Sequence, residues 1–161
     1  MSRRSAGLLV YRRGPGGRLE VLIGHMGGPF WARKDAAAWS IPKGELDEGE
    51  EPRAAALREY AEELGLAPPA HDPADLLDLG EVRQSGGKVV TVFAVAGDVD
   101  PEAVVPGTFP LEWPRGSGVV REVPEVDRVG WFDLDTAGEK LVKGQVPILA
   151  RLRDAVGLDA P

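Results

Sequence analysis

The sequence predicts a single domain of the α/β or α+β class, and three observations support this. Its 161 residues suffice for one hydrophobic core. Apolar residues make up 43% and charged residues 28%, as in ordinary globular proteins. Segments with strand and helix patterns mix along the chain, with no repeat or low-complexity linker between them. We therefore expect residues 1–161 to form one domain.

The first part of the chain predicts a hairpin, a loop and a helix. The apolar runs SAGLLVYRR and RLEVLIGH are separated by GPGG, whose residues favour a turn. The segment GGPFWARKDAAAWSIPKGE has no helical period, so we expect a loop that leads to a short strand over residues 38–41. Pro52 suits the first turn of the following helix, and Gly65 suits the position just after its end.

The second part predicts strands followed by a helical segment. A Ser-Gly-Gly turn joins one strand to a β-branched strand over residues 88–96, and DRVGWFDL forms the last strand. Residues 97–127 are rich in proline, glycine and acids, with TFPLEW as a candidate edge strand. The segment from residue 135 to 157 is helical in two pieces, broken near Gly144–Pro147. Its apolar positions recur at helical spacing: Ile148, Leu149, Leu152, Ala155 and Val156.

Composition excludes several function classes. The net charge of −7 argues against a broad surface for nucleic acid, whereas a bound cation would still permit phosphate-bearing small molecules. The absence of cysteine excludes disulfides, thiolate zinc sites and cysteine nucleophiles. The apolar run over residues 6–11 is too short for a signal peptide, and no stretch has the length of a membrane span. We expect a cytoplasmic protein without a membrane partner.

The segment from Gly44 to Gly65 concentrates negative charge. On a helix with 100° per residue, Glu59, Glu62 and Glu63 share an arc of about 100°. The opposite face, which we expect to be buried, carries Ala54, Leu57, Ala61 and Leu64. Repulsion between the glutamates costs about 0.2–0.5 kcal/mol per pair. Two interpretations stay open: a solvated acidic face, or an all-oxygen site for a hard divalent cation such as Mg²⁺.

The same residues match the Nudix box. Its seven fixed positions are all present, at Gly44, Glu50, Arg58, Glu59, Glu62, Glu63 and Gly65. Tyr60 stands where an aliphatic residue is usual. The chain thus resembles the Nudix hydrolases, and the resemblance implies an α/β/α sandwich with a mixed sheet. It also implies Mg²⁺- or Mn²⁺-dependent hydrolysis of the pyrophosphate linkage of a nucleoside diphosphate joined to another moiety.

Two alternatives to an enzyme remain at this point. One is a catalytically silent Nudix-fold module that binds a nucleotide as a sensor or regulator. The other is an acidic protein-interaction domain whose helix is only a solvated face. The intact glutamates favour the enzyme, because a binding module is free to lose them.

The resemblance also implies roles for the box residues. Glu59 and Glu63 become metal ligands, and Glu62 becomes a third ligand or the base that activates water. The carbonyl of Gly44 completes the metal shell. Arg58 orients a box glutamate, and Glu50 supports the loop and the helix start. The catalytic set is therefore Glu59, Glu62 and Arg58, with Mg²⁺ or Mn²⁺ as cofactor.

Residues outside the box are weaker candidates. Lys43 is either a phosphate contact or a surface lysine, and Phe30 and Trp31 lie in a loop where they could stack on a base. Glu122 and Glu125 are either alternative bases or part of an exposed acidic loop. We expect Trp39 and Trp131 in the core, and His25 and His71 in structural or exposed positions. The box identifies neither the moiety joined to the nucleotide nor the oligomeric state.

Overall fold

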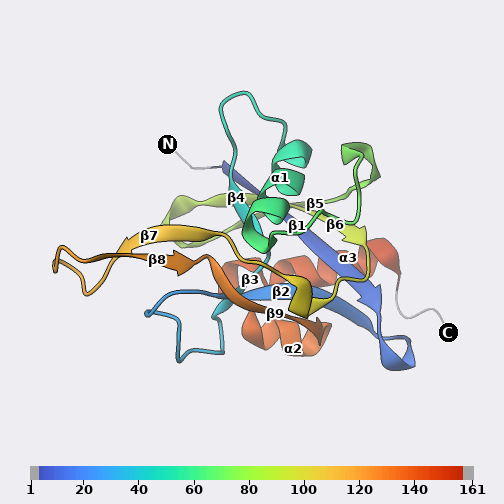
Figure 1. Ribbon diagram of the computed structural model, residues 1–161. Coiled ribbons are helices and arrows are strands. Elements are labelled where there is room, and N and C mark those ends of the chain that lie inside the picture. Colours follow the sequence, from blue (N-terminus) through green and yellow to red (C-terminus); the bar gives the residue numbers. More distant parts are fainter. Residues whose placement is uncertain (1–3, 158–161) are drawn as a thin grey trace.

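The computed structural model describes residues 4–157 and has three layers (Figure 1). A seven-stranded mixed sheet separates α1 (Pro52–Leu64) from α2 (Leu134–Lys140) and α3 (Pro147–Val156). This arrangement confirms the predicted α/β/α sandwich.

Strand β1 (Arg4–Arg13) is the centre of the sheet. Its residues 4–11 pair in parallel with residues 89–96 of β6. On its other edge, the first half of β1 pairs with β4 and the second half with β2, both antiparallel. Strand β2 also pairs with β3 and β9, and β6 pairs with β5. The bounds of these strands are β2 Leu19–Met26, β3 Trp39–Ser40, β4 Lys43–Glu45, β5 Leu77–Arg83, β6 Val89–Ala96 and β9 Val126–Asp133.

Alternation along β1 builds a core on each face of the sheet. Successive side chains of a strand point to opposite faces. Leu8 and Val10 accordingly belong to the cluster that packs under α1, whereas Leu9 belongs to the cluster that packs on α2 and α3. The run GLLVY is apolar throughout because both faces of β1 are covered.

Helix α1 has the predicted ends but a different buried face. It begins at Pro52, and Gly65 follows it with a φ of 65°, the left-handed conformation that suits glycine. The fully buried residues are Ala55, Ala56, Tyr60 and Leu64, whereas Ala54, Leu57 and Ala61 are only half-buried. The buried face of α1 is thus rotated by part of a turn from the predicted one, because the side of the helix that carries the glutamates also packs against β4. Burial raises the pKa of Tyr60 to about 12.

Two strands were not predicted, β4 and β8 (Val120–Pro124). Both are short, and their apolar residues are too few to give a strand pattern. Strand β4 pairs with residues 5–7 of β1, at the point where a loop was expected. Strand β8 pairs with β7 (Thr108–Glu112), the predicted edge strand, and this separate hairpin projects beyond the three layers (Figure 1).

The remaining elements follow the prediction closely. The two-piece helix is confirmed with one difference, because Ala155 is exposed. Trp39 is buried, and Trp131 is partly buried against the core. His71 is exposed and His25 is fully buried, where its ring nitrogens lie within hydrogen-bond distance of the Asp127 carboxylate and the Lys34 carbonyl. Within residues 4–157, no helix is long and apolar enough to cross a membrane.

Candidate active site

Arg58 joins the acidic loop to the glutamates of α1. Its Nε and Nη2 donate to the two carboxylate oxygens of Glu50, each at 2.8 Å. Its Nη1 donates to Glu59 at 2.8 Å and to Glu62 at 3.1 Å, and its Nη2 also reaches the carbonyl of Glu45 at 3.1 Å. The guanidinium lowers the pKa of Glu50 to about 2, because the paired donors favour the charged carboxylate. Arg58 therefore pairs with three carboxylates, offsets part of their charge and fixes where they lie.

Glu59 packs against the backbone of β4. Its side chain is 13% exposed, and a Cβ atom added to Gly44 would lie 1.9 Å from its Oε1. Only glycine at position 44 leaves room for this carboxylate. Burial raises the pKa of Glu59, and the neighbouring Arg58 opposes that shift. The strand and the helix therefore meet at a carboxylate that is only partly hydrated.

Substituting Gly44 with alanine should displace Glu59 without unfolding the protein. The new methyl group would occupy the space of the carboxylate, and a displacement of about 1 Å in a catalytic group costs on the order of 10²-fold in rate. We expect Gly44→Ala to reduce hydrolysis of a nucleotide substrate by that factor, measured as kcat. Gly138→Ala in α2 is the matched control, since its Cβ makes only an ordinary contact of 3.8 Å with Leu149. Equal activity of the two variants would contradict this account.

Glu63 is the most deeply buried carboxylate of the box. It accepts a hydrogen bond from the backbone N–H of Lys43 at 3.2 Å. Burial, together with the negative charge of Glu125, raises the pKa of Glu63 to about 8, and the Lys43 ammonium only partly opposes the shift. Burial in turn lowers the pKa of Lys43. The interior side of the site thus holds an acid that keeps its proton near neutral pH unless a further positive charge is supplied.

Glu125 was predicted only as an alternative, and the structure places it beside the box. It links β8 to β9; its backbone N–H donates to the Gly107 carbonyl at 2.8 Å, and its own carbonyl accepts from Gly27 at 3.0 Å. Burial and the charge of Glu62 raise the pKa of Glu125. The other alternative, Glu122, is exposed on β8 and accepts a hydrogen bond from Thr108 at 3.0 Å. Geometry therefore favours Glu125 over Glu122.

The raised pKa of Glu63 predicts that the stability of the metal-free protein depends on pH. Between pH 4.5 and about 8 the folded protein holds this proton, whereas the unfolded chain releases it near 4.5. The folded state therefore binds more protons in that window. We expect the contribution of Glu63 to the free energy of unfolding to be fully present below pH 4.5 and to be lost as pH rises through 8. Urea denaturation in EDTA, compared between wild type and Glu63→Gln at each pH, measures it; parallel pH profiles would contradict the assignment.

The box glutamates share one helix face but do not form a ready cluster. Among residues 4–157, no three carboxylate or imidazole side chains come together as a metal site. Arg58 instead donates hydrogen bonds to oxygens of Glu59 and Glu62. The donor chemistry nevertheless fits a hard cation, because Glu59, Glu63 and the Gly44 carbonyl offer only oxygen, and the glycine lets the Glu59 carboxylate lie against β4. On these grounds we keep Glu59, Glu63 and the Gly44 carbonyl as proposed metal ligands.

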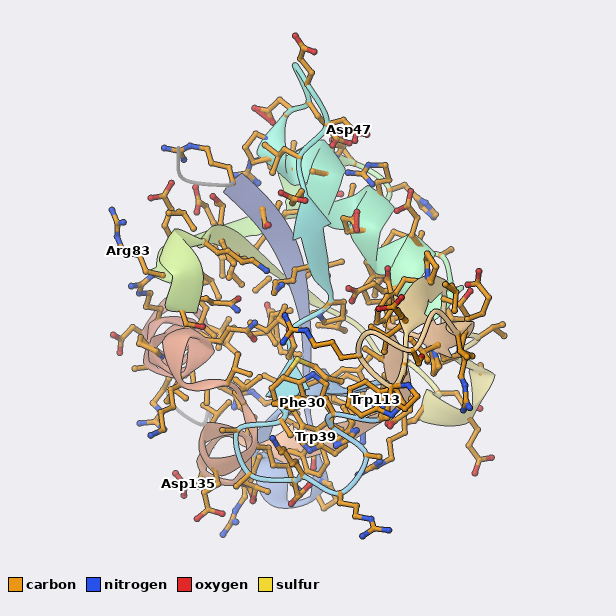
Figure 2. All side chains as sticks on the ribbon, turned by 90° about the vertical axis from the view of Figure 1, so that its left-hand side faces the viewer. Phe30, Trp39, Asp47, Arg83, Trp113 and Asp135 are labelled. Carbon is orange, nitrogen blue, oxygen red and sulfur yellow. The ribbon has the colours of Figure 1, made fainter. Side chains whose placement is uncertain are left out.

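A cavity of about 740 Å³ opens next to Lys43. Trp31 lines it, so two of the three predicted substrate contacts lie at one cavity. Phe30 is not among its lining residues; it packs edge-to-face on Trp31, with ring centroids 4.8 Å apart, and is 56% exposed. Figure 2 shows Phe30 in the loop in front of Trp39, with Asp47 beside the acidic loop, below its tip. Sequence reasoning missed the other basic residues of the lining, because none belongs to a motif: Arg83 ends β5, and Lys88 and Lys143 lie in the turns that follow β5 and precede α3.

The fold and the glutamate-bearing helix define a protein of the Nudix class. The model of the NUDIX domain matches residues 1–152. The chain belongs to the Nudix family.

Curated relatives match the chain over a short region. Two proteins named RNA pyrophosphohydrolase, from Roseobacter denitrificans and Rhodospirillum rubrum, are 46% identical over 54 residues and 44% identical over 63 residues. These regions cover 32% and 38% of this chain, and 29% and 36% of the relatives. The chain thus spans about a third of the length of the curated relatives it matches.

Solved structures match the chain along its length. A C. elegans Ap4A hydrolase in a binary complex has a TM-score of 0.63 at 20% identity, over 96% of this chain and 97% of that one. The NUDIX domain of Shewanella oneidensis NrtR, complexed with ADP ribose, has a TM-score of 0.63 at 17% identity, over 98% and 90%. At these identities the likeness concerns the fold.

Proposed function

We propose that the protein is a divalent-metal-dependent pyrophosphohydrolase that cuts the pyrophosphate linkage of a nucleoside diphosphate joined to another moiety. The observation that carries the proposal is the buried acid at the junction of α1 and β4. Glu63 and Glu59 are withdrawn from water beside Glu125, with Lys43 and Arg58 as the neighbouring cations. Burying like charges is costly, and a bound cation removes that cost. The names of the curated relatives and the Ap4A hydrolase fold support the same class of reaction.

The chain supplies the oxygen ligands and the positioning. Glu59, Glu63 and the Gly44 carbonyl would hold Mg²⁺ or Mn²⁺, with Glu62 as a further ligand. Such a cation neutralises phosphate charge and lowers the pKa of bound water. Arg58 holds Glu50, Glu59 and Glu62 in place from outside the cation site. Glu125, partly buried and near Glu62, is our choice for the base that removes the proton of the attacking water.

A metal titration combined with a substrate panel tests the proposal. We expect millimolar Mg²⁺ to raise the melting temperature, and the rise to be absent in Glu63→Gln. The panel comprises nucleoside triphosphates, dinucleoside polyphosphates, ADP-ribose and nucleotide sugars, with released phosphate or nucleoside monophosphate as readout. Nucleotide binding without turnover would identify a sensor. No response to either Mg²⁺ or nucleotide would reject both the hydrolase and the sensor, and the acidic helix would then be only a solvated face.

A further inference from the structure

The cavity beside Lys43 is enclosed by four separate parts of the chain. They are the end of β2 with its following loop, the β3–β4 region, the turn between β5 and β6, and the turn before α3. The lining residues are Met26, Trp31, Ser40, Lys43, Arg83, Gln84, Ser85, Lys88, Val142, Lys143 and Gly144. Lys43 connects the cavity with the candidate cation site, because its backbone N–H donates to Glu63 at 3.2 Å and its ammonium interacts with the charges of both Glu63 and Lys88.

The lining is basic although the protein is acidic. It includes four cationic residues and no acidic one, in a chain of net charge −7. Lys88 and Lys43 are near enough for their charges to repel. In the part of the chain that the structure describes, Arg83, Lys88 and Lys143 form no ion pair. Arg83 lies at the outer margin of the molecule in Figure 2, so the two lysines opposite Lys43 carry the argument.

A buried glutamine holds the walls of this cavity in place. Gln145 is fully buried, and its Oε1 accepts from the Ile41 N–H at 2.9 Å. Its Nε2 donates to Ser40 at 2.9 Å and to Gln84 at 3.0 Å. The turns also touch directly, since a Cβ on Gly144 would lie 2.4 Å from the Arg83 carbonyl. The segments that carry Lys43, Lys88 and Lys143 are therefore fixed relative to one another before any ligand arrives.

We propose that this cavity binds a phosphate group of the substrate beyond the pyrophosphate linkage that is cut. The inference rests on the proposed function and narrows its substrate class to nucleotides with three or more linked phosphates. Lysine ammonium groups bind phosphate as point charges. A nucleotide sugar would place a neutral sugar against three lysines and leave their charges uncompensated. A polyphosphate chain neutralises them, and its next phosphates lie toward the buried glutamates and their cation.

Direct binding of inorganic tripolyphosphate tests the cavity independently of catalysis. Calorimetric titration in EDTA should find one site in the wild-type protein. We expect Lys88→Ala and Lys143→Ala each to weaken binding about tenfold, as for the loss of a hydrogen bond to a charged group. Arg18→Ala, which removes a cation from the β1–β2 turn, should bind as the wild type does. Unchanged binding in the Lys88→Ala, Lys143→Ala double variant would overturn the inference.

Turnover separates this inference from the proposed function. The wild-type kcat/KM should be higher for a dinucleoside tetraphosphate than for ADP-glucose, and the double variant should lose about 100-fold more on the tetraphosphate. If no nucleotide is hydrolysed but tripolyphosphate binding still depends on the lysines, the proposed function fails and the anion site stands. If Glu63-dependent hydrolysis is found and the lysines affect neither binding nor preference, the anion site alone is rejected.

Discussion

Glu63→Gln is expected to reduce turnover by about 10²-fold or more while leaving the protein folded, since even residues that only support a metal ligand contribute about 10–100-fold to activity. The amide keeps the shape of the side chain and its acceptor oxygen for the Lys43 N–H, but it cannot supply negative charge to a cation. The same change removes a buried acid, so the free energy of unfolding in EDTA above pH 8 should rise. Single-turnover hydrolysis and urea denaturation measure the two effects. A loss of activity combined with a gain of stability is the signature of a functional carboxylate.

Glu48→Gln is the matched control for this prediction. Glu48 is exposed in the same acidic segment, and no role is assigned to it. Its amide variant should have wild-type activity and stability, within about 0.5 kcal/mol. Glu63→Gln with more than a third of wild-type kcat would show that the buried acid is dispensable.

Arg58→Met is expected to lower both stability and activity. The side chain of Arg58 is 28% exposed, and those of its partners Glu50 and Glu59 are 16% and 13% exposed, so the network is screened less than a surface ion pair. Removing it leaves three carboxylates without their cation. We expect a loss of about 2 kcal/mol, below the value for a fully buried pair because water still reaches part of the network. Chemical denaturation measures it, and activity should fall because Glu59 and Glu62 lose their fixed positions.

Two variants make this prediction specific. Arg58→Lys restores the charge but not the fork that binds both Glu50 oxygens, so it should recover only part of the stability. Arg121→Met removes an exposed cation from β8 and should change stability by less than about 0.5 kcal/mol. Arg58→Met and Arg121→Met unfolding at the same urea concentration would contradict the role of the network.

Local sequence signals predicted the helix and most of the strands. Pro52 and Gly65 marked the ends of α1, because both act through backbone geometry that the residue itself determines. The buried face of α1 was misplaced, because it depends on the orientation in which the helix meets the sheet. The predicted buried face did not include Tyr60, whereas in the structure Tyr60 packs in one core with residues of β1 and β6. Tertiary packing decided that position.

The sequence predicted the part of the candidate site that a motif specifies. It did not predict the part that forms only when residues distant in sequence come together in the fold. The spacing of the box glutamates follows from helical geometry. Glycine is required at position 44 because a side chain there would collide with the Glu59 carboxylate. The approach of Glu125 to the box depends on the backbone bonds of residues 27, 107 and 125, which come from three distant parts of the chain. Lys88 and Lys143 meet Lys43 for the same reason, through turns that only the folded sheet brings together.

The central place of β1 has a consequence for how the chain is made. The hairpin with β2 pairs residues 10–13 with residues 19–22, so it can form while translation is at an early stage. The other edge of β1 must wait for residues 89–96, its parallel partner. Until those residues leave the ribosome, an apolar strand has one edge open to nonnative pairing, and contacts so far apart in sequence form slowly. A nascent chain of about 100 residues is therefore the stage at which we expect chaperones to matter most.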